Sequence, residues 1–148
     1  MMALAYALAY PATKFEPAGL VDLSSKTERE RLSSSALKGF FNLVTKWHVR
    51  DEDARELLGG ISSSAFYEWK KTPNRLLDVD RITRISFLVG IYKALHIIYG
   101  DKLADEWVSL PNKNAIFAGR TPLQYMLSGG LIGMQTVRKL LDARRGGR

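Results

Sequence analysis

The segment RDEDARELLGGISSSAFYEWKK, Arg50–Lys71, decides the fold because two adjacent glycines divide it into two short amphipathic stretches. Asp51 can cap the first stretch, whose acidic start suits the positive end of a helix dipole. Gly59 and Gly60 end that helix, and Ser62 can cap the second one. The apolar residues that face inward recur at helical spacing: Ala54, Leu57, Leu58, Ala65, Phe66 and Trp69. The segment therefore predicts two short helices joined by a tight turn.

Two short helices around a glycine turn are typical of a helix-turn-helix, which places its second helix in the major groove of DNA. Serine hydroxyls and helix N-terminal amides can contact phosphates or bases, and basic side chains nearby can neutralise phosphates. The candidate DNA-contacting residues are Ser62, Ser63, Ser64, Tyr67, Lys70, Lys71 and Arg75. A plain helical hairpin inside a bundle explains the same pattern, so both interpretations stay open at this point.

The segment before this unit divides into a leader and a helix. We expect residues 1–32 to be a leader, either disordered or an amphipathic arm, because two prolines and a glycine break any long element. Its apolar opening has no basic stretch ahead of it, as a signal peptide would, and it is too short to span a membrane. A helix is expected from Ser33, with the hydroxyls of residues 33–35 as caps. Its apolar stripe is Leu37, Phe40, Phe41, Val44 and Trp47.

A longer helix is predicted from Asp78 to about Tyr99, where apolar residues cover a wide part of the helix circumference. Such a helix is buried on several sides, so we expect it to be the central core element and a candidate dimer seam. Gly100 ends it, and Asp101 can cap a short helix that runs through Trp107.

The last third of the chain contains strong turn chemistry. Thr121 is a predicted N-cap, with Pro122 at the first helical position, where a missing N–H has no consequence. This short helix ends at the pair Gly129–Gly130. A last helix is expected over residues 132–143, and the basic tail beyond it should be mobile because it has no apolar anchor.

No segment shows sustained strand alternation, so the predicted fold class is all-α. A helix-turn-helix unit covers residues 33–76, and a second helical region with a basic tail covers residues 77–148. The chain has no cysteine, which excludes disulfides and thiolate zinc sites and suits a reducing cytoplasm. The net charge is +7, and residues 76–148 hold 11 basic against 6 acidic groups. This balance favours an acidic or polyanionic partner, although a solubilising surface explains it too.

The chain offers no recognisable reactive site. His48 and His96 are far apart, and neither has a second ligand spaced for a metal site. We expect His96 to be packed or hydrogen-bonded in the long helix, and His48 to lie near a helix C-terminus. There is no cluster of nucleophile, acid and base and no phosphate-binding glycine loop. The sequence therefore predicts no enzyme, no cofactor and no metal site.

An ordered set of landmarks extends over roughly residues 35–142. It consists of the segment GISSSAFYEWKK followed by Trp107, Pro111, Asn112, Phe117, Gly119, Thr121, Pro122, Leu123, Gly129, Val137 and Leu140. In this order the landmarks resemble the Xre/MbcA/ParS antitoxin family. The resemblance implies a helix-turn-helix followed by a toxin-binding domain in a type II antitoxin. The implied partners are a RES-domain toxin, which depletes cellular NAD, and the operator DNA of its own promoter. Because helix-turn-helix proteins read paired half-sites, a homodimer is expected.

The candidate toxin-binding residues lie in the loop after Pro111 and in the basic carboxyl-terminal helix and tail. They are Asn112, Phe117, Arg120, Arg138, Arg144, Arg145 and Arg148. A stiff loop offers recognition at low ordering cost, with Phe117 docking it onto the core. The terminal arginines could enter a toxin cleft shaped for an anionic dinucleotide, whereas a solvated basic end or a DNA phosphate contact explains them as well. The alternative for the whole chain is a stand-alone helix-turn-helix transcription regulator whose C-terminal helices mediate dimerisation.

Overall fold

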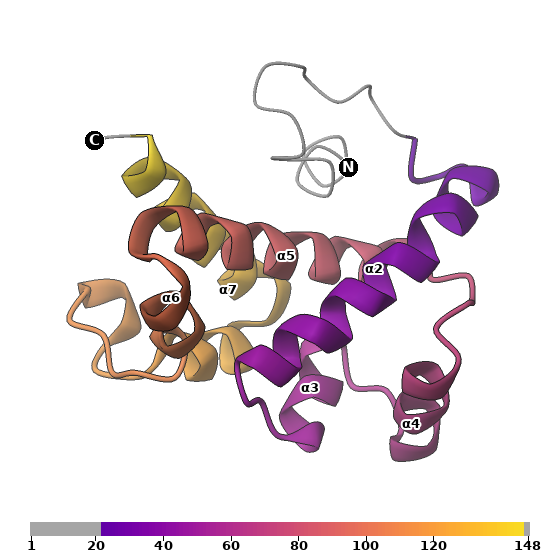
Figure 1. Cartoon of the computed structure of the whole chain (residues 1–148), viewed down its shortest axis with the longest axis horizontal. Coiled ribbons are helices and arrows are strands. Elements are labelled where there is room, and N and C mark those ends of the chain that lie inside the picture. Colours follow the sequence, from indigo (N-terminus) through magenta and orange to yellow (C-terminus); the bar gives the residue numbers. More distant parts are fainter. Residues whose placement is uncertain (1–21, 147–148) are drawn as a thin grey trace.

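The computed structural model describes residues 22–146 of the chain, and within them every regular element is helical (Figure 1). The all-α fold class is therefore confirmed for this part of the chain. The elements in chain order are α2 (Lys26–Lys46), α3 (Asp51–Leu57), α4 (Ser63–Lys71), α5 (Val79–Tyr99), α6 (Asp101–Trp107), the short 3-10 helix η1 (Ala115–Phe117) and α7 (Pro122–Arg145).

Helix α2 begins at Lys26, about two turns before the start at Ser33 that the apolar spacing predicts. The Ser25 hydroxyl caps it by accepting a hydrogen bond from the Glu28 backbone N–H at 3.4 Å. The predicted start is wrong because the first turns of α2 read KTERER and carry no apolar stripe. The remainder of the expected leader, residues 1–21, lies outside the described residues.

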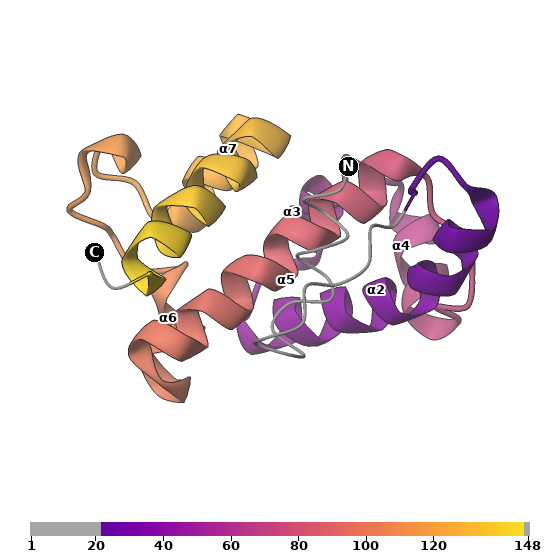
Figure 2. The same cartoon turned by 90° about the horizontal axis from the view of Figure 1, so that it is seen from above.

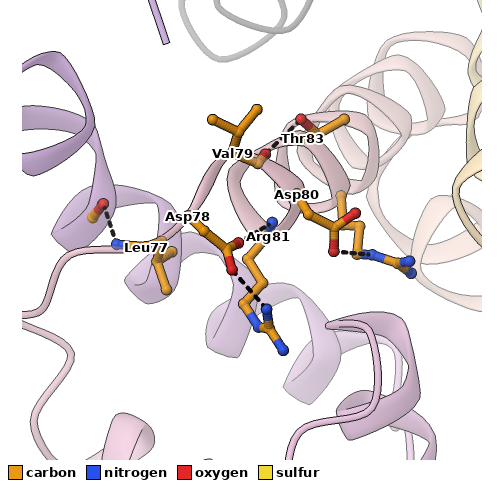
Figure 3. A network of polar contacts seen from close by, with 8 residues as sticks. Leu77, Asp78, Val79, Asp80, Arg81 and Thr83 are labelled. Atoms are coloured by element: carbon orange, nitrogen blue, oxygen red, sulfur yellow. Dashed lines mark hydrogen bonds and ion pairs between the residues drawn. The ribbon is translucent and has the colours of Figure 1, made fainter. Parts of the chain in front are cut away.

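Ser33 is not a cap but a fully buried residue in the middle of α2. Its hydroxyl donates to the Arg29 carbonyl at 2.5 Å and accepts from the Leu77 backbone N–H at 2.9 Å. The second bond fastens α2 to the segment that enters α5, and Figure 3 shows it at the Leu77 nitrogen. The buried hydroxyl thus has a partner for both its donor and its acceptor function.

The turn between α3 and α4 has the geometry that the two glycines require. Gly59 and Gly60 both have positive φ, 95° and 85°, which favours glycine over other residues. The Gly60 N–H donates to the Arg55 carbonyl at 2.8 Å and closes the end of α3. The Ser62 hydroxyl then caps α4 by accepting from the Ala65 N–H at 3.1 Å. The predicted turn and the predicted Ser62 cap are confirmed.

Two other predicted caps are wrong in the same way. Asp51 and Asp101 are each the first helical residue, and the N-cap positions belong to Arg50 and Gly100. Neither of these two residues caps its helix by accepting a hydrogen bond through a side chain. Gly100, at φ 76°, ends α5 and starts α6 without a spacer, so no residue is left between the two helices to act as a separate cap. The aspartates still favour the positive end of each helix through their charge.

Helix α5 is the core of the molecule and contacts α2, α6 and α7 (Figure 2). Asp78 caps it as predicted, accepting from the Arg81 N–H at 2.9 Å (Figure 3). Among residues 22–146, α5 alone is long and apolar enough to cross a membrane, with a mean hydropathy of 1.3. Packing inside the protein explains this apolar composition without a membrane, because the core side chains of α5 are fully buried: Ile82, Ile85, Leu88, Ile91 and Leu95.

Helix α7 is capped by Thr121 in a capping box, with reciprocal bonds of 3.0 Å to and from Gln124. Pro122 occupies its first turn, as predicted. Gly130, at φ 60° and ψ −142°, breaks the helix into two parts, which confirms the predicted break at the glycine pair. The second part runs on to Arg145, so the residues after position 143 are not all part of a mobile tail as predicted.

Candidate functional site

The outward face of α4 carries most of the residues predicted to touch DNA. Phe66 is buried on its opposite face, and its ring lies edge-on to Phe41 of α2 with 5.4 Å between centroids. The exposed residues are Ser62, Ser63, Ser64, Tyr67, Lys70 and Lys71. Helix α4 therefore packs by one side and leaves a serine-rich start and a basic last turn facing solvent. This distribution suits contact with phosphates at both ends of the helix.

Tyr67 links the two helices of the unit. Its hydroxyl donates to Asp51 Oδ2 at 2.5 Å, and its side chain remains 50% exposed. This hydrogen bond, followed by the negative charge of Asp51, raises the pKa of Tyr67 above its ordinary value of 10.0. The link to α3 was missed from the sequence, because an i to i+16 contact leaves no periodic signal.

Arg75 lies apart from the outward face of α4. Its guanidinium is 5.6 Å from the ring centroid of Trp69, and its Nε and Nη2 donate to the Thr72 carbonyl at 3.4 Å. An ion pair of 3.9 Å joins it to Glu68. The structure thus brings the predicted serines, tyrosine and lysines together and uses Arg75 to brace the chain after α4.

The end of α5 forms the carboxyl-terminal unit together with α6, η1 and α7. A row of four aromatic rings runs through this unit, and we call it the aromatic row: Tyr99, Trp107, Phe117 and Tyr125. Successive centroids lie 6.5, 6.0 and 5.2 Å apart, in stacked and edge-on arrangements. Phe117 is fully buried inside the row. The docking of its loop onto the core is confirmed, and the ring presents no surface in this structure. Its contact with a toxin stays a prediction.

Arginines lie at both ends of the aromatic row. Arg120 is 5.5 Å from the Tyr125 centroid, and its Nη1 donates to Ser128 Oγ at 2.9 Å. Arg144 Nη1 donates to the Tyr99 hydroxyl at 2.6 Å. The expectation that Arg144 belongs to a free tail is therefore wrong, because this bond and the last turn of α7 hold it against α5. Both arginines keep further N–H donors beyond these bonds.

Arg138 is an interhelical residue in this structure. Only 13% of its side chain is exposed, and its Nε donates to both oxygens of Asp142, at 3.1 and 3.0 Å. Its Nη1 is buried without a hydrogen-bond partner and lies against Gly90 of α5. Burial lowers the pKa of Lys93, and the positive charge of Arg138 lowers it further. The guanidinium is thus largely buried where α7 packs on α5, and the contact of Arg138 with a toxin stays a prediction.

The remaining predicted partner contacts differ in exposure. Asn112 is half-buried, and its side-chain oxygen accepts from the Asn114 N–H at 2.9 Å, which fixes the loop. Arg145 is also half-buried in the last turn of α7, and this burial lowers the pKa of its guanidinium. Arg148 lies outside the described residues.

His96 is hydrogen-bonded, as predicted. Its Nδ1 lies 2.9 Å from Asp101 Oδ1 and its Nε2 lies 2.9 Å from Asp105 Oδ1, so the ring joins α5 to α6. His48 follows the end of α2 in a left-handed turn at φ 56°. Within residues 22–146, no group of three or more acidic, histidine or cysteine side chains could hold a metal ion.

The class of protein follows from the fold: a helix-turn-helix unit, α3 and α4, is joined to a second helical unit that has arginines at both ends of the aromatic row. Residues 26–90 match the family described as the antitoxin Xre-like helix-turn-helix domain. Residues 94–147 match the family described as the antitoxin Xre/MbcA/ParS C-terminal toxin-binding domain. The chain therefore belongs to the Xre/MbcA/ParS antitoxin family and is the antitoxin of a toxin–antitoxin system.

A relative of similar length is the uncharacterised protein y4oB of Sinorhizobium fredii. It is 37% identical to this chain over 112 residues, which cover 75% of this chain and 84% of the relative. No solved structure is significantly similar to the chain.

Proposed function

We propose that this antitoxin neutralises a RES-domain toxin and represses its own operon by binding operator DNA, as a cytoplasmic homodimer. It acts by binding alone and carries out no reaction. The observation that carries the proposal is the pairing of two surfaces at separate places in the fold. One is the exposed face of α4, and the other is the arginine-bearing carboxyl-terminal unit.

The DNA-binding half of the proposal rests on the chemistry of α4. Three exposed serines lie at its N-terminus, where the positive end of the helix favours a phosphate and a hydroxyl can meet a base edge. Lys70 and Lys71 extend the basic surface along the same helix. No arginine or amide side chain stands at the start of α4, so base readout by each protomer is modest, and two copies are needed for specificity.

The toxin-binding half rests on Arg120 and Arg144, which the aromatic row holds at its two ends. Guanidinium groups pair with carboxylates in a bidentate manner, so acidic side chains of the toxin near its NAD-binding cleft are the partners that we propose for them. Arginines held in position lose little conformational entropy when they bind.

The test is whether the purified full chain binds the product of the neighbouring gene, which we expect to encode a RES-domain protein. Co-purification at a fixed stoichiometry and restored growth on co-expression support the proposal. If the neighbouring product does not bind, the RES-domain partner is wrong.

The second candidate function is a stand-alone transcription regulator whose C-terminal helices mediate dimerisation. The exposed apolar side chain of Ile97 favours it, because this residue near the end of α5 is 55% exposed. This candidate predicts operator binding with no toxin partner, so the same binding experiment separates the two.

A further inference from the structure

A solvent-open cavity of about 520 Å³ lies beside the inner side of α4, and the exposed Ser62 is among its lining residues. Its wall is formed by the inner side of α4, the first turns of α2 and the entry to α5. The apolar lining residues are Ile61, Ala65, Trp69, Leu76 and Leu77. A volume of this size is in the range of small-molecule sites, which are mostly apolar with a few placed polar groups.

The polar lining of the cavity is positive. Arg29 and Arg81 contribute two guanidiniums, and Asp78 contributes the one carboxylate among the lining residues, which leaves a net charge of +1. Asp78 is already engaged, because its oxygens accept from the Arg81 backbone N–H and from Arg81 Nη1 at 2.9 and 2.8 Å (Figure 3). The charge of the second guanidinium has no carboxylate in the cavity to balance it.

The two guanidiniums also have more donors than acceptors. Arg29 Nη1 donates to the carbonyls of Leu23 and Ser24 at 2.9 and 3.1 Å, whereas its Nε is buried without a hydrogen-bond partner. Arg81 Nε is likewise buried without one. A guanidinium has five N–H donors, and leaving buried donors unpaired is unfavourable. An anion beside these residues would supply the negative charge that the lining of the cavity lacks.

The cavity lies where it can influence α4. Phe66 is the one fully buried residue of that helix, and it packs toward α2. On the cavity side, α4 meets α5 through the Trp69 ring, whose centroid is 5.9 Å from the Arg81 guanidinium. Ser62, the cap of α4, lines the same cavity. A molecule in the cavity would therefore touch both the start and the inner side of α4.

We propose that this cavity binds a small molecule with a flat apolar body and one anionic group, a carboxylate, phosphate or sulfonate. The apolar body packs on Trp69 and Leu76, and the anionic group lies between Arg29 and Arg81. Binding weakens operator binding, because a negative charge in the cavity that Ser62 lines repels the phosphate that would approach the start of α4. This second effect rests on the proposed DNA binding, whereas the ligand site itself does not.

The probe is 1-anilinonaphthalene-8-sulfonate, an aromatic anion whose fluorescence rises in apolar sites, titrated into the full chain without DNA. We expect saturable binding of one molecule per chain. The neutral analogue N-phenyl-1-naphthylamine has the same rings without the sulfonate and reports on the apolar part alone. Arg29→Gln together with Arg81→Gln should weaken binding of the sulfonate about tenfold or more and leave the neutral analogue nearly unchanged.

Two further variants keep the test independent of folding defects. Leu76→Glu changes a side chain that is 41% exposed, so the fold tolerates it while the new charge repels the sulfonate. Arg31→Gln is the matched control, because Arg31 is exposed on α2 and does not line the cavity. Circular dichroism confirms the helical content of each variant.

Equal sulfonate binding by the wild type, the double glutamine variant and Leu76→Glu overturns the proposal. Loss of binding as the chain dimerises with rising concentration also overturns it, because a second copy then fills the cavity. A chain that binds the sulfonate with the expected pattern but binds no operator keeps the site and refutes the proposed DNA binding. Operator binding that saturating sulfonate leaves unchanged overturns the effect on α4.

Discussion

Gly90 leaves the space in which the Arg138 guanidinium lies. A Cβ at this position would be 1.5 Å from Arg138 Nη1 and 2.4 Å from its central carbon. Glycine in the middle of a helix is unfavourable by about 1 kcal/mol relative to alanine. Its presence in α5 is therefore explained by the close approach of α7, whose Arg138–Asp142 ion pair is held against this surface.

The first prediction concerns this contact. Gly90→Ala should lower the free energy of unfolding by about 1 kcal/mol. The new methyl group displaces the Arg138 guanidinium, and the free energy lost with this contact exceeds the gain in helix propensity. In an Arg138→Ala background the same substitution should raise it, since only the propensity gain remains. Urea unfolding of the four proteins in this double-mutant cycle measures the coupling, and equal effects of Gly90→Ala in both backgrounds would show that the two residues do not interact.

Tyr67 gives a prediction on pH. Its pKa is raised in the folded protein, chiefly by the hydrogen bond to Asp51, so the folded state keeps the phenol proton to higher pH than the unfolded state. The stabilisation by this bond is fully present below the unfolded pKa near 10.0 and is lost as pH rises through the folded pKa. Tyr67→Phe should therefore be less stable than the wild type at pH 8, and the difference should shrink in alkaline solution. A difference that stays constant with pH in thermal unfolding contradicts this role.

The two glycines at the break in α7 have different backbone conformations. Gly130 has φ 60° and ψ −142°, a conformation that is essentially restricted to glycine. Gly129 is helical, and a Cβ at this position would meet no other atom within 4 Å. Gly130→Ala should lower the free energy of unfolding by about 1–3 kcal/mol. Gly129→Ala is the matched control and should be neutral or stabilising by up to about 1 kcal/mol. Thermal unfolding measures the stability of both variants. If Gly130→Ala leaves the free energy of unfolding unchanged, α7 is a continuous helix.

Helix α4 is the element on which DNA binding depends. Lys70→Ala together with Lys71→Ala should weaken operator binding and reduce the slope of log affinity against log salt by about two, one for each lost phosphate contact. Lys102→Ala with Lys113→Ala is the control, because both lysines are exposed but belong to the carboxyl-terminal unit. Fluorescence anisotropy at several salt concentrations gives the slopes. An unchanged slope in the first variant removes these lysines from the interface.

The elements themselves could largely be predicted from the sequence, because apolar spacing and glycine turns act locally. The start of α2 could not, since its first turns are charged and are stabilised by Ser25 and by long-range contacts through Ser33. The capping positions of Asp51 and Asp101 were wrong by one residue each, because an aspartate favours the cap and the first turn alike.

Across the whole molecule, the α4 surface could be predicted and the arginine contacts could not. Exposure along α4 follows from helix periodicity, so Ser63, Ser64 and the two lysines share one face, whereas the cap Ser62 lies toward the inner side. Arg138 packs against Gly90 and Arg144 donates to Tyr99, and both of these contacts are with α5, far away in the sequence. Phe117 is buried against rings of α6 and α7. Such contacts depend on how the helices pack, which no local pattern contains. The cavity beside α4 was missed for the same reason.

The carboxyl-terminal end provides a prediction for the whole molecule. Deleting the residues after Asp142 removes Arg145 and removes Arg144 together with its hydrogen bond to Tyr99. The buried residues between α5 and α7 remain. The truncated chain should fold and bind operator DNA normally but neutralise the toxin less well. Helical content and operator affinity are the controls. Full rescue of growth by the truncated chain would show that these arginines play no part in neutralisation.

The most direct test of the account is the intracellular NAD concentration after induction of the neighbouring gene, with and without this chain. If the chain is the antitoxin of a RES-domain toxin, NAD should fall when the neighbouring gene is expressed alone and stay near its starting level when the full chain is co-expressed. An equal fall of NAD in both cultures, at equal levels of both proteins, would contradict the account.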